Sequence, residues 1–72
     1  MWELVTANIL AETIIELMPG LAASLTAGGT LVASGIIQDR TQAVKAALQE
    51  NGLSLAEQRA DGEWVALIAH RR

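Results

Sequence analysis

Apolar residues gather in short runs that alternate with amphipathic stretches along the chain. The apolar run Leu4–Leu10 predicts a buried strand, with a polar residue, Asn8, near its end. A second run, Thr30–Ser34, predicts another strand that stops at Gly35. The two runs are too short for buried helices, so the pattern favours a sheet with helices between its strands.

Between these two strands, apolar residues recur at the spacing of one helix face. Those residues are Ile14, Leu17, Met18, Leu21 and Leu25. Pro19 falls within the pattern, where it removes a backbone donor and clashes with the preceding turn. We therefore predict a break near Met18 and a second helical segment that begins at Pro19 and ends at Gly28–Gly29.

A second helix is predicted from about Arg40 to Gln49. Asp39 stands at the N-cap position, and Gln42 follows three residues later, as in a capping box. Asn51–Gly52 provides the residues that end a helix. The predicted buried face consists of Val44, Ala47 and Leu48.

Two further strands follow, predicted from Leu53 to about Arg59 and from Trp64 to Ala69. Asp61–Gly62 between them is a strong hairpin signal, because both residues tolerate positive φ. The last strand is apolar on both faces, which is typical of a central strand. Trp64 could stack on a ligand, but this pattern favours a place in the core.

Handedness fixes how these elements assemble into an α/β fold. Right-handed crossovers place both helices on one face of the sheet. The final hairpin then adds an antiparallel pair, which gives the strand order 1-2-4-3. Nothing in the chain covers the opposite face or the edge of the first strand. The pattern therefore predicts one part of a larger structure.

Composition narrows the function classes. Five basic residues against eight acidic ones give a net charge of -3, which argues against a nucleic-acid surface. The chain has no cysteine, so disulfides and thiolate metal sites are excluded, and no metal site is predicted. Glu12, Glu16 and Asp39 interrupt the apolar runs, so no membrane span is expected. We expect a soluble, cytoplasmic protein.

Four segments together carry a resemblance to a known family: Val5–Ala11, Leu17–Pro19, Gly28–Ile36 and Gly62–Leu67. They are similar to the C-terminal half of the bacterial ribosomal-protein L-eleven methyltransferases, which are S-adenosylmethionine-dependent enzymes of the class I fold. The resemblance covers the chain from Trp2 to about His70.

This resemblance implies that residues 1–72 form a single partial methyltransferase domain, the C-terminal half of a Rossmann-like sheet. The family's glycine-rich cofactor loop and its separate substrate-recognition domain have no counterpart in these residues. For the intact family member, S-adenosylmethionine is the implied cofactor, and a ribosomal protein methylated on lysine or amino groups is the implied partner. This chain alone is expected to be inactive.

The resemblance also singles out candidate site residues, while the catalytic residue stays unassigned. Asn8 closes the first strand, where an amide can bind the cofactor or a target amine; alternatively it caps the following helix. Ile9 and Leu10 either line the wall of a ligand pocket or belong to the ordinary hydrophobic core. Ser34 and Gly35 border the substrate side of the cleft, or form a strand end with an unusual backbone angle.

Two explanations of the uncovered edge of the first strand remain open. In the first, a missing N-terminal half of the domain covers it. In the second, the chain is a small α/β binding or assembly module that forms a homodimer across the edge and does no catalysis. His70, the only histidine, is interpreted as a solvated side chain near the C-terminus.

Overall fold

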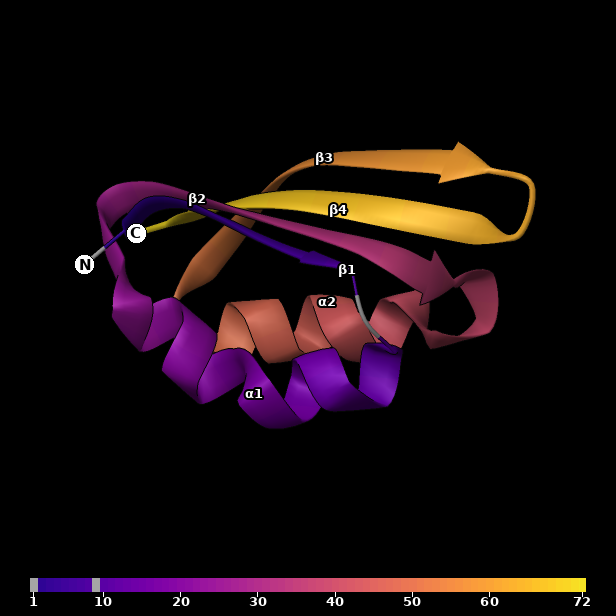
Figure 1. The fold of residues 1–72 in the computed structure, drawn as a ribbon, viewed down its shortest axis with the longest axis horizontal. Coiled ribbons are helices and arrows are strands. Elements are labelled where there is room, and N and C mark those ends of the chain that lie inside the picture. Colours follow the sequence, from indigo (N-terminus) through magenta and orange to yellow (C-terminus); the bar gives the residue numbers. More distant parts are fainter. Residues whose placement is uncertain (1, 9) are drawn as a thin grey trace.

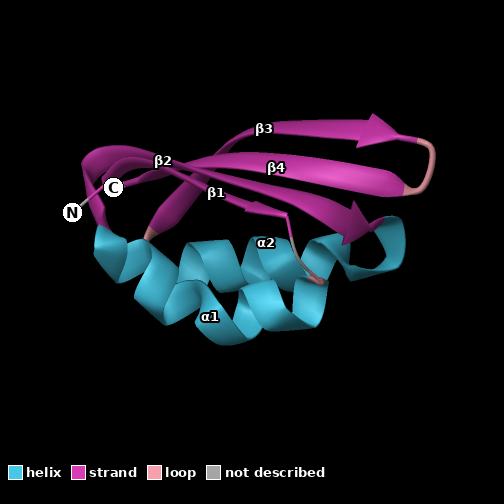
Figure 2. Cartoon of the chain, in the orientation of Figure 1, coloured by secondary structure: helices cyan, strands magenta, loops and turns pink. Residues whose placement is uncertain are grey.

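A computed structural model describes the backbone of residues 2–8 and 10–72, and the side chains of residues 3–6 and 10–72 (Figure 1). Within these residues, the chain forms four strands and two α-helices, and the last two strands follow each other directly (Figure 2). Their bounds are β1 Trp2–Asn8, α1 Ala11–Ser24, β2 Leu25–Ile37, the short 3-10 helix η1 Gln38–Arg40, α2 Thr41–Glu50, β3 Leu53–Asp61 and β4 Trp64–Arg71.

The strands form one mixed sheet in the order β1-β2-β4-β3. β1 and β2 are parallel, whereas β4 runs antiparallel to both of its neighbours, β2 and β3. The predicted α/β class, the order 1-2-4-3 and the central position of the last strand are all confirmed. This outcome agrees with the rule that parallel strands joined through a helix connect in the right-handed sense, and with the tight hairpin between β3 and β4.

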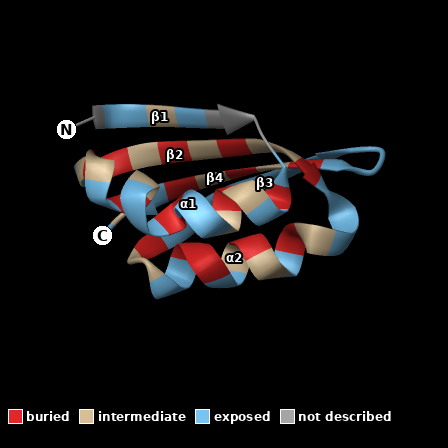
Figure 3. Cartoon of the chain, turned by 60° about the horizontal axis from the view of Figure 1, so that its bottom comes forward, coloured by how far each residue is buried: buried red, intermediate tan, exposed pale blue. Residues whose placement is uncertain are grey.

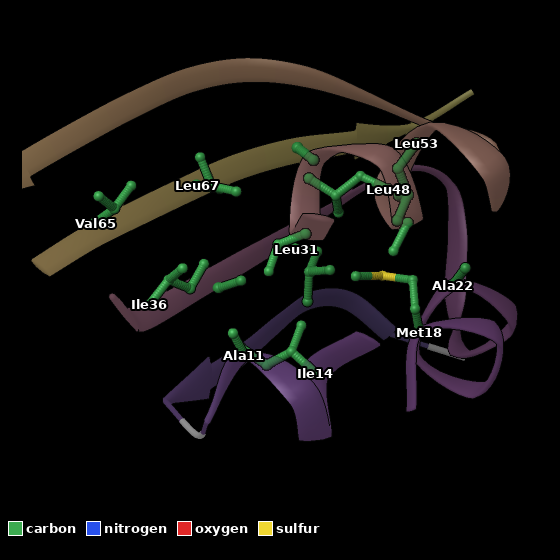
Figure 4. Packing of buried hydrophobic residues seen from close by; sticks show 14 of the residues in the cluster. Ala11, Ile14, Met18, Ala22, Leu31, Ile36, Leu48, Leu53, Val65 and Leu67 are labelled. Atoms are coloured by element: carbon green, nitrogen blue, oxygen red, sulfur yellow. The ribbon is translucent and has the colours of Figure 1, made fainter. Parts of the chain in front are cut away.

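Both helices pack against the same face of the sheet, as predicted (Figure 1). Ile14 and Met18 of α1 and Leu48 of α2 are almost fully buried against Leu31 of β2 and Leu67 of β4 (Figure 4). Burying such side chains stabilises the fold by roughly 1.5–3 kcal/mol each. The core therefore lies between the helix layer and one face of the sheet.

The predicted break in the first helix does not occur. α1 is continuous through Pro19 and ends at Ser24, and Leu25 already belongs to β2. Met18 and Ala22 on either side of the proline are buried, whereas Pro19 itself is exposed. Packing of these neighbours on the sheet outweighs the lost helical hydrogen bond, because most helical stability in proteins is tertiary.

The second strand is longer than predicted and does not stop at Gly35. β2 continues to Ile37, and its register with β4 shifts between Ala33 and Ile36. Ser34 and Gly35 thus form a β-bulge, and Gly35 has a φ of 74°. A bulge admits an extra residue and bends the strand without ending it.

The start of the second helix also differs from the prediction. Gln38–Arg40 forms η1, so α2 begins at Thr41, and no side chain caps it. The predicted capping box of Asp39 and Gln42 is therefore wrong. The predicted buried face is confirmed for Val44, Ala47 and Leu48.

The end of α2 agrees with the sequence signal. The Asn51 side-chain amide donates a hydrogen bond of 2.8 Å to the carbonyl oxygen of Ala47. Gly52 follows with a φ of 79°, in the left-handed region that favours glycine.

The hairpin loop is shifted by one residue from its predicted position. Asp61 is the last residue of β3 and pairs with Trp64, so the loop consists of Gly62 and Glu63. Only Gly62 has a positive φ, of 63°, which is the pattern of a type II′ turn.

Two glycine substitutions are expected to change stability in opposite directions. Nothing lies within 4 Å of a Cβ added at Gly20 or Gly52, so backbone conformation alone decides the result. Gly52→Ala places alanine at a positive φ and should lower the free energy of unfolding by about 1–2 kcal/mol. Gly20→Ala lies within α1 and should raise it by about 0.5–1 kcal/mol. Urea denaturation measures both; the same sign for the two variants would contradict the assigned backbone.

Candidate functional site

The face of the sheet opposite the helices carries exposed apolar side chains. Leu4 is 58% exposed and Trp64 is 55% exposed, while Val32 and Ile68 between them are partly buried. Val32 and Ile68 are register partners on β2 and β4, so they lie side by side at the centre of this face. We call this side of the sheet the outer face.

A cavity of about 360 Å³ lies between the bulge of β2 and the β3–β4 hairpin. The hairpin end of the sheet is exposed in Figure 3, where it is coloured pale blue. The cavity is lined by Ser34, Gly35, Arg59, Ala60, Asp61, Trp64, Val65 and Ala66. We call it the hairpin cavity.

The cavity lies at the carboxyl ends of the two parallel strands. Asn8, the last residue of β1, has Ser34 as its register partner, and Ser34 lines the cavity. In open α/β sheets, ligands bind outside the carboxyl ends of parallel strands. The bulge at Gly35 is the second feature typical of such sites, because bulges redirect side chains there.

The predicted site residues have different positions in this geometry. Asn8 closes β1, as predicted, but its side chain lies outside the described residues, as does the whole of Ile9. Leu10 is 71% exposed, so it is not a core residue. The N-cap position of α1 is Leu10 and not Asn8.

Ser34 and Gly35 come together with residues that the sequence analysis did not select. Arg59 and Asp61 arrive from the end of β3, and Trp64 from the start of β4. The predicted topology contained a signal that could have identified Arg59 and Asp61 as lining residues. The turn between β3 and β4 falls at the sheet end where β2 finishes, so the charged residues beside that turn meet Ser34.

Trp64 was predicted to lie in the core, and this is wrong. Its neighbours Val65 and Leu67 face the helices and are buried, whereas Trp64 belongs to the outer face. The two-sided apolar pattern correctly indicated a central strand. It did not reveal that helices cover only one of the two faces.

The two charged side chains that line the cavity, Arg59 and Asp61, differ in whether they have a charged partner. The Arg59 guanidinium forms an ion pair with Glu57, which precedes it on β3. None of the described residues forms a hydrogen bond or an ion pair with the Asp61 carboxylate. The cavity lining thus contains one guanidinium and one carboxylate, of which only the guanidinium is ion-paired among the described residues.

His70 and the Glu12–Arg40 pair lie away from the cavity. His70 is exposed, and its Nδ1 lies 2.9 Å from Thr30 Oγ1, toward the opposite end of β4. Glu12 Oε1 lies 2.7 Å from Arg40 Nε, and this ion pair links α1 to η1. Among the described side chains, no three of the kinds that bind metals gather in one place, and no described helix is long and apolar enough to span a membrane.

Comparison with known proteins identifies the family of this chain. The model of the family described as ribosomal protein L11 methyltransferase matches residues 1–72. The chain belongs to this family. The family resemblance read from the sequence is thus confirmed, and so is a methyltransferase relationship.

Individual members of the family support the same conclusion. The chain is 47% identical over 68 residues to the ribosomal protein L11 methyltransferase of Desulforapulum autotrophicum, and 46% identical over 69 residues to that of Heliobacterium modesticaldum. These alignments cover 94% and 96% of the chain. The chain spans about 22% of the length of each relative.

A solved structure shares the fold. The ribosomal protein L11 methylase of Lactobacillus delbrueckii subsp. bulgaricus superposes with a TM-score of 0.91 at 33% sequence identity. The match covers 97% of this chain and 36% of that protein. Most of the neighbour's polypeptide therefore has no counterpart in these residues.

Substitution of Trp64 tests whether its side chain lies on the outer face or in the core. We expect Trp64→Ala to lower the free energy of unfolding by less than about 1 kcal/mol, whereas removal of a core tryptophan costs about 3–5 kcal/mol. Leu67→Ala, on the buried face of the same strand, is the control and should cost about 2–5 kcal/mol. Chemical denaturation measures both, and equal large losses would place Trp64 in the core.

Proposed function

We propose that this chain is the C-terminal half of an S-adenosylmethionine-dependent methyltransferase domain, which methylates amino groups of a ribosomal protein. The family match over residues 1–72 carries this proposal. The cavity at the carboxyl ends of β1 and β2 supports it, because the cavity lies where open α/β sheets bind ligands. The whole reaction belongs to a longer polypeptide, since the chain spans about 22% of its relatives.

The position and chemistry of Asn8 support a cofactor site at the end of β1. Asn8 ends β1 and offers an amide that both donates and accepts hydrogen bonds. No glycine-rich turn follows β1, since α1 begins at Ala11, so contacts to the rest of the cofactor must come from elsewhere. The outward edge of β1, which has no strand partner among the described residues, is the direction from which they would come.

The chemistry needs little more than positioning from this chain. When bound, S-adenosylmethionine supplies a methyl group on a sulfonium. The acceptor amine must be neutral and aligned with that methyl group, and holding the two reactants in place supplies much of the rate. The role proposed for Asn8 is to orient the amine or the cofactor at the end of β1.

Exchange of segments tests the proposal. We expect the Desulforapulum autotrophicum relative to methylate its ribosomal protein when this chain replaces the matching 68 residues. Asn8→Ala in that chimera should lower the rate at least about tenfold, because loss of one hydrogen bond at a reacting centre costs that much or more. Transfer of labelled methyl groups measures the rate.

The control for this exchange is Gln42→Ala, which removes an exposed side-chain amide on α2, away from the cavity. It should leave the rate unchanged. A folded chimera without activity would contradict the proposed function. Full activity of Asn8→Ala would remove Asn8 from the site.

Self-association is a second candidate function, and the exposed apolar side chains favour it. Leu4 on the edge strand and Trp64 on the outer face are both more than half exposed. An edge strand with apolar neighbours pairs readily with another chain. A two-fold dimer across β1 would remove the edge without any catalysis.

Light scattering after size-exclusion chromatography tests this candidate. If the edge drives pairing, the chain should form a dimer whose fraction rises with concentration, and Leu4→Glu should abolish it by placing a charge in the contact. Glu16→Gln, on the exposed surface of α1, is the control. A monomer at every concentration would exclude self-association.

A further inference from the structure

We infer that Asp61–Gly62, at the tip of the β3–β4 hairpin, is a site of spontaneous backbone modification, where Asp61 converts to isoaspartate through a cyclic succinimide. The substrate is the chain itself, and water is the only co-reactant. This inference goes beyond the proposed function and does not depend on it. It follows from the exposure of the hairpin tip and from the contrast with a second pair of the same kind, Asn51–Gly52.

The reaction joins two adjacent residues. The backbone nitrogen of Gly62 attacks Cγ of the protonated Asp61 carboxyl, and the carboxyl hydroxyl leaves together with the amide proton as water. Water then opens the imide ring. Attack at Cγ restores aspartate, whereas attack at the main-chain carbonyl carbon breaks its bond to the Gly62 nitrogen. The chain is then linked through Cγ, and this product, isoaspartate, has the same atoms as the original.

The structure leaves both reacting groups open. Asp61, Gly62 and Glu63 are exposed, and nothing lies within 4 Å of a Cβ added at Gly62. Within the described residues, the Gly62 N–H donates no hydrogen bond and the Asp61 carboxylate accepts none. Glycine also adds no side chain that would hinder attack by its own nitrogen. The nucleophile and the electrophile can therefore meet without the loss of a hydrogen bond that holds either one.

Asn51–Gly52 has the same chemistry in a different environment, because asparagine forms the same imide by losing ammonia instead of water. The Asn51 side-chain amide donates a hydrogen bond of 2.8 Å to the carbonyl oxygen of Ala47. The Gly52 N–H donates one of 3.2 Å to the carbonyl oxygen of Gln49. Ring closure must break both bonds, and two net hydrogen bonds correspond to at least about a tenfold slower reaction. The end of α2 is thus protected, whereas the hairpin tip is not.

The product changes the shape of the hairpin. Linkage through Cγ adds one carbon to the main chain, so Asp61 no longer fits its register with Trp64. The tip is joined to η1 by a hydrogen bond of 2.8 Å from the Gln38 N–H to the carbonyl oxygen of Glu63, and this bond is lost when the tip moves. Asp61 and Trp64 also line the hairpin cavity, so its wall changes. Isomerisation is therefore an age-dependent alteration of this end of the sheet.

Peptide mapping of the aged chain tests the site. The folded protein is incubated in mildly acidic buffer, because the protonated carboxyl is the electrophile. Trypsin places Asp61 in the peptide Ala60–Arg71 and Asp39, which precedes the bulky Arg40, in Met1–Arg40. Chromatographic retention and electron-transfer fragmentation distinguish isoaspartate from aspartate. We expect isoaspartate at Asp61, with an intermediate one water lighter, and none at Asp39.

The variant Asp61→Asn gives a matched comparison, because the chain then carries two Asn–Gly pairs. Deamidation raises the mass of the peptides Ala60–Arg71 and Ala46–Arg59, which report the two positions. In the folded variant, position 61 should deamidate at least about tenfold faster than Asn51, because only Asn51 and its glycine must break hydrogen bonds. In guanidinium chloride the two rates should agree within about threefold, since both pairs are then unfolded.

Hydrogen exchange tests the effect on the hairpin. The isoaspartyl form is separated by chromatography and compared with the original chain. The amide of Gln38 should exchange at least about tenfold faster in the isoaspartyl form, because its hydrogen bond to Glu63 is lost. The amide of Val44, within α2 and away from the hairpin, is the control and should exchange at the same rate in both forms.

Three results would overturn the inference. Absence of isoaspartate at Asp61, after an incubation in which the unfolded chain forms it, would exclude the site. Equal deamidation at both positions of the folded Asp61→Asn variant would show that the fold does not select the hairpin. Unchanged exchange at Gln38 in the isoaspartyl form would contradict the effect on the hairpin. All three measurements use this chain alone, so their outcomes are independent of methyltransferase activity in the chimera.

Discussion

Packing of both helices against a single face of the sheet is the constraint on which the rest of the structure depends. Ile14 and Met18 from α1 and Leu48 from α2 meet Leu31 and Leu67 there (Figure 4). Because a small domain has little stability to spare, this one layer of contacts must hold all four strands. It leaves the outer face and the edge of β1 uncovered, and these are the surfaces where the hairpin cavity and the proposed contacts lie.

The bulge of β2 links this scaffold to the cavity. Without the extra residue at Ser34–Gly35, the pairing of β2 with β4 would continue in one register through the hairpin end. The positive φ of Gly35 permits the shift, and the strand then continues to Ile37. Gly35, which was predicted to end the strand, instead lines the hairpin cavity.

The strand order and the helix face could be predicted, because handedness, hairpin chemistry and helical periodicity are local signals. The course of α1 through Pro19 could not, because packing of its neighbours decides it. The exposure of Trp64 could not either, since an apolar strand looks the same whether one face or both are covered. Asp61 was noticed only as a turn residue; its place in the cavity depends on the register between β3, β4 and β2.

The described residues form an open sheet, in which no described strand pairs with the outward edge of β1. Residue-resolved amide hydrogen exchange of the chain in dilute solution tests it directly. Parallel pairing with β2 engages alternate amides of β1, so we predict slow exchange at those positions and fast exchange at the residues between them. β4, paired on both sides, should be protected throughout. Slow exchange at every amide of β1 would show that this chain already covers its own edge, and would contradict the account.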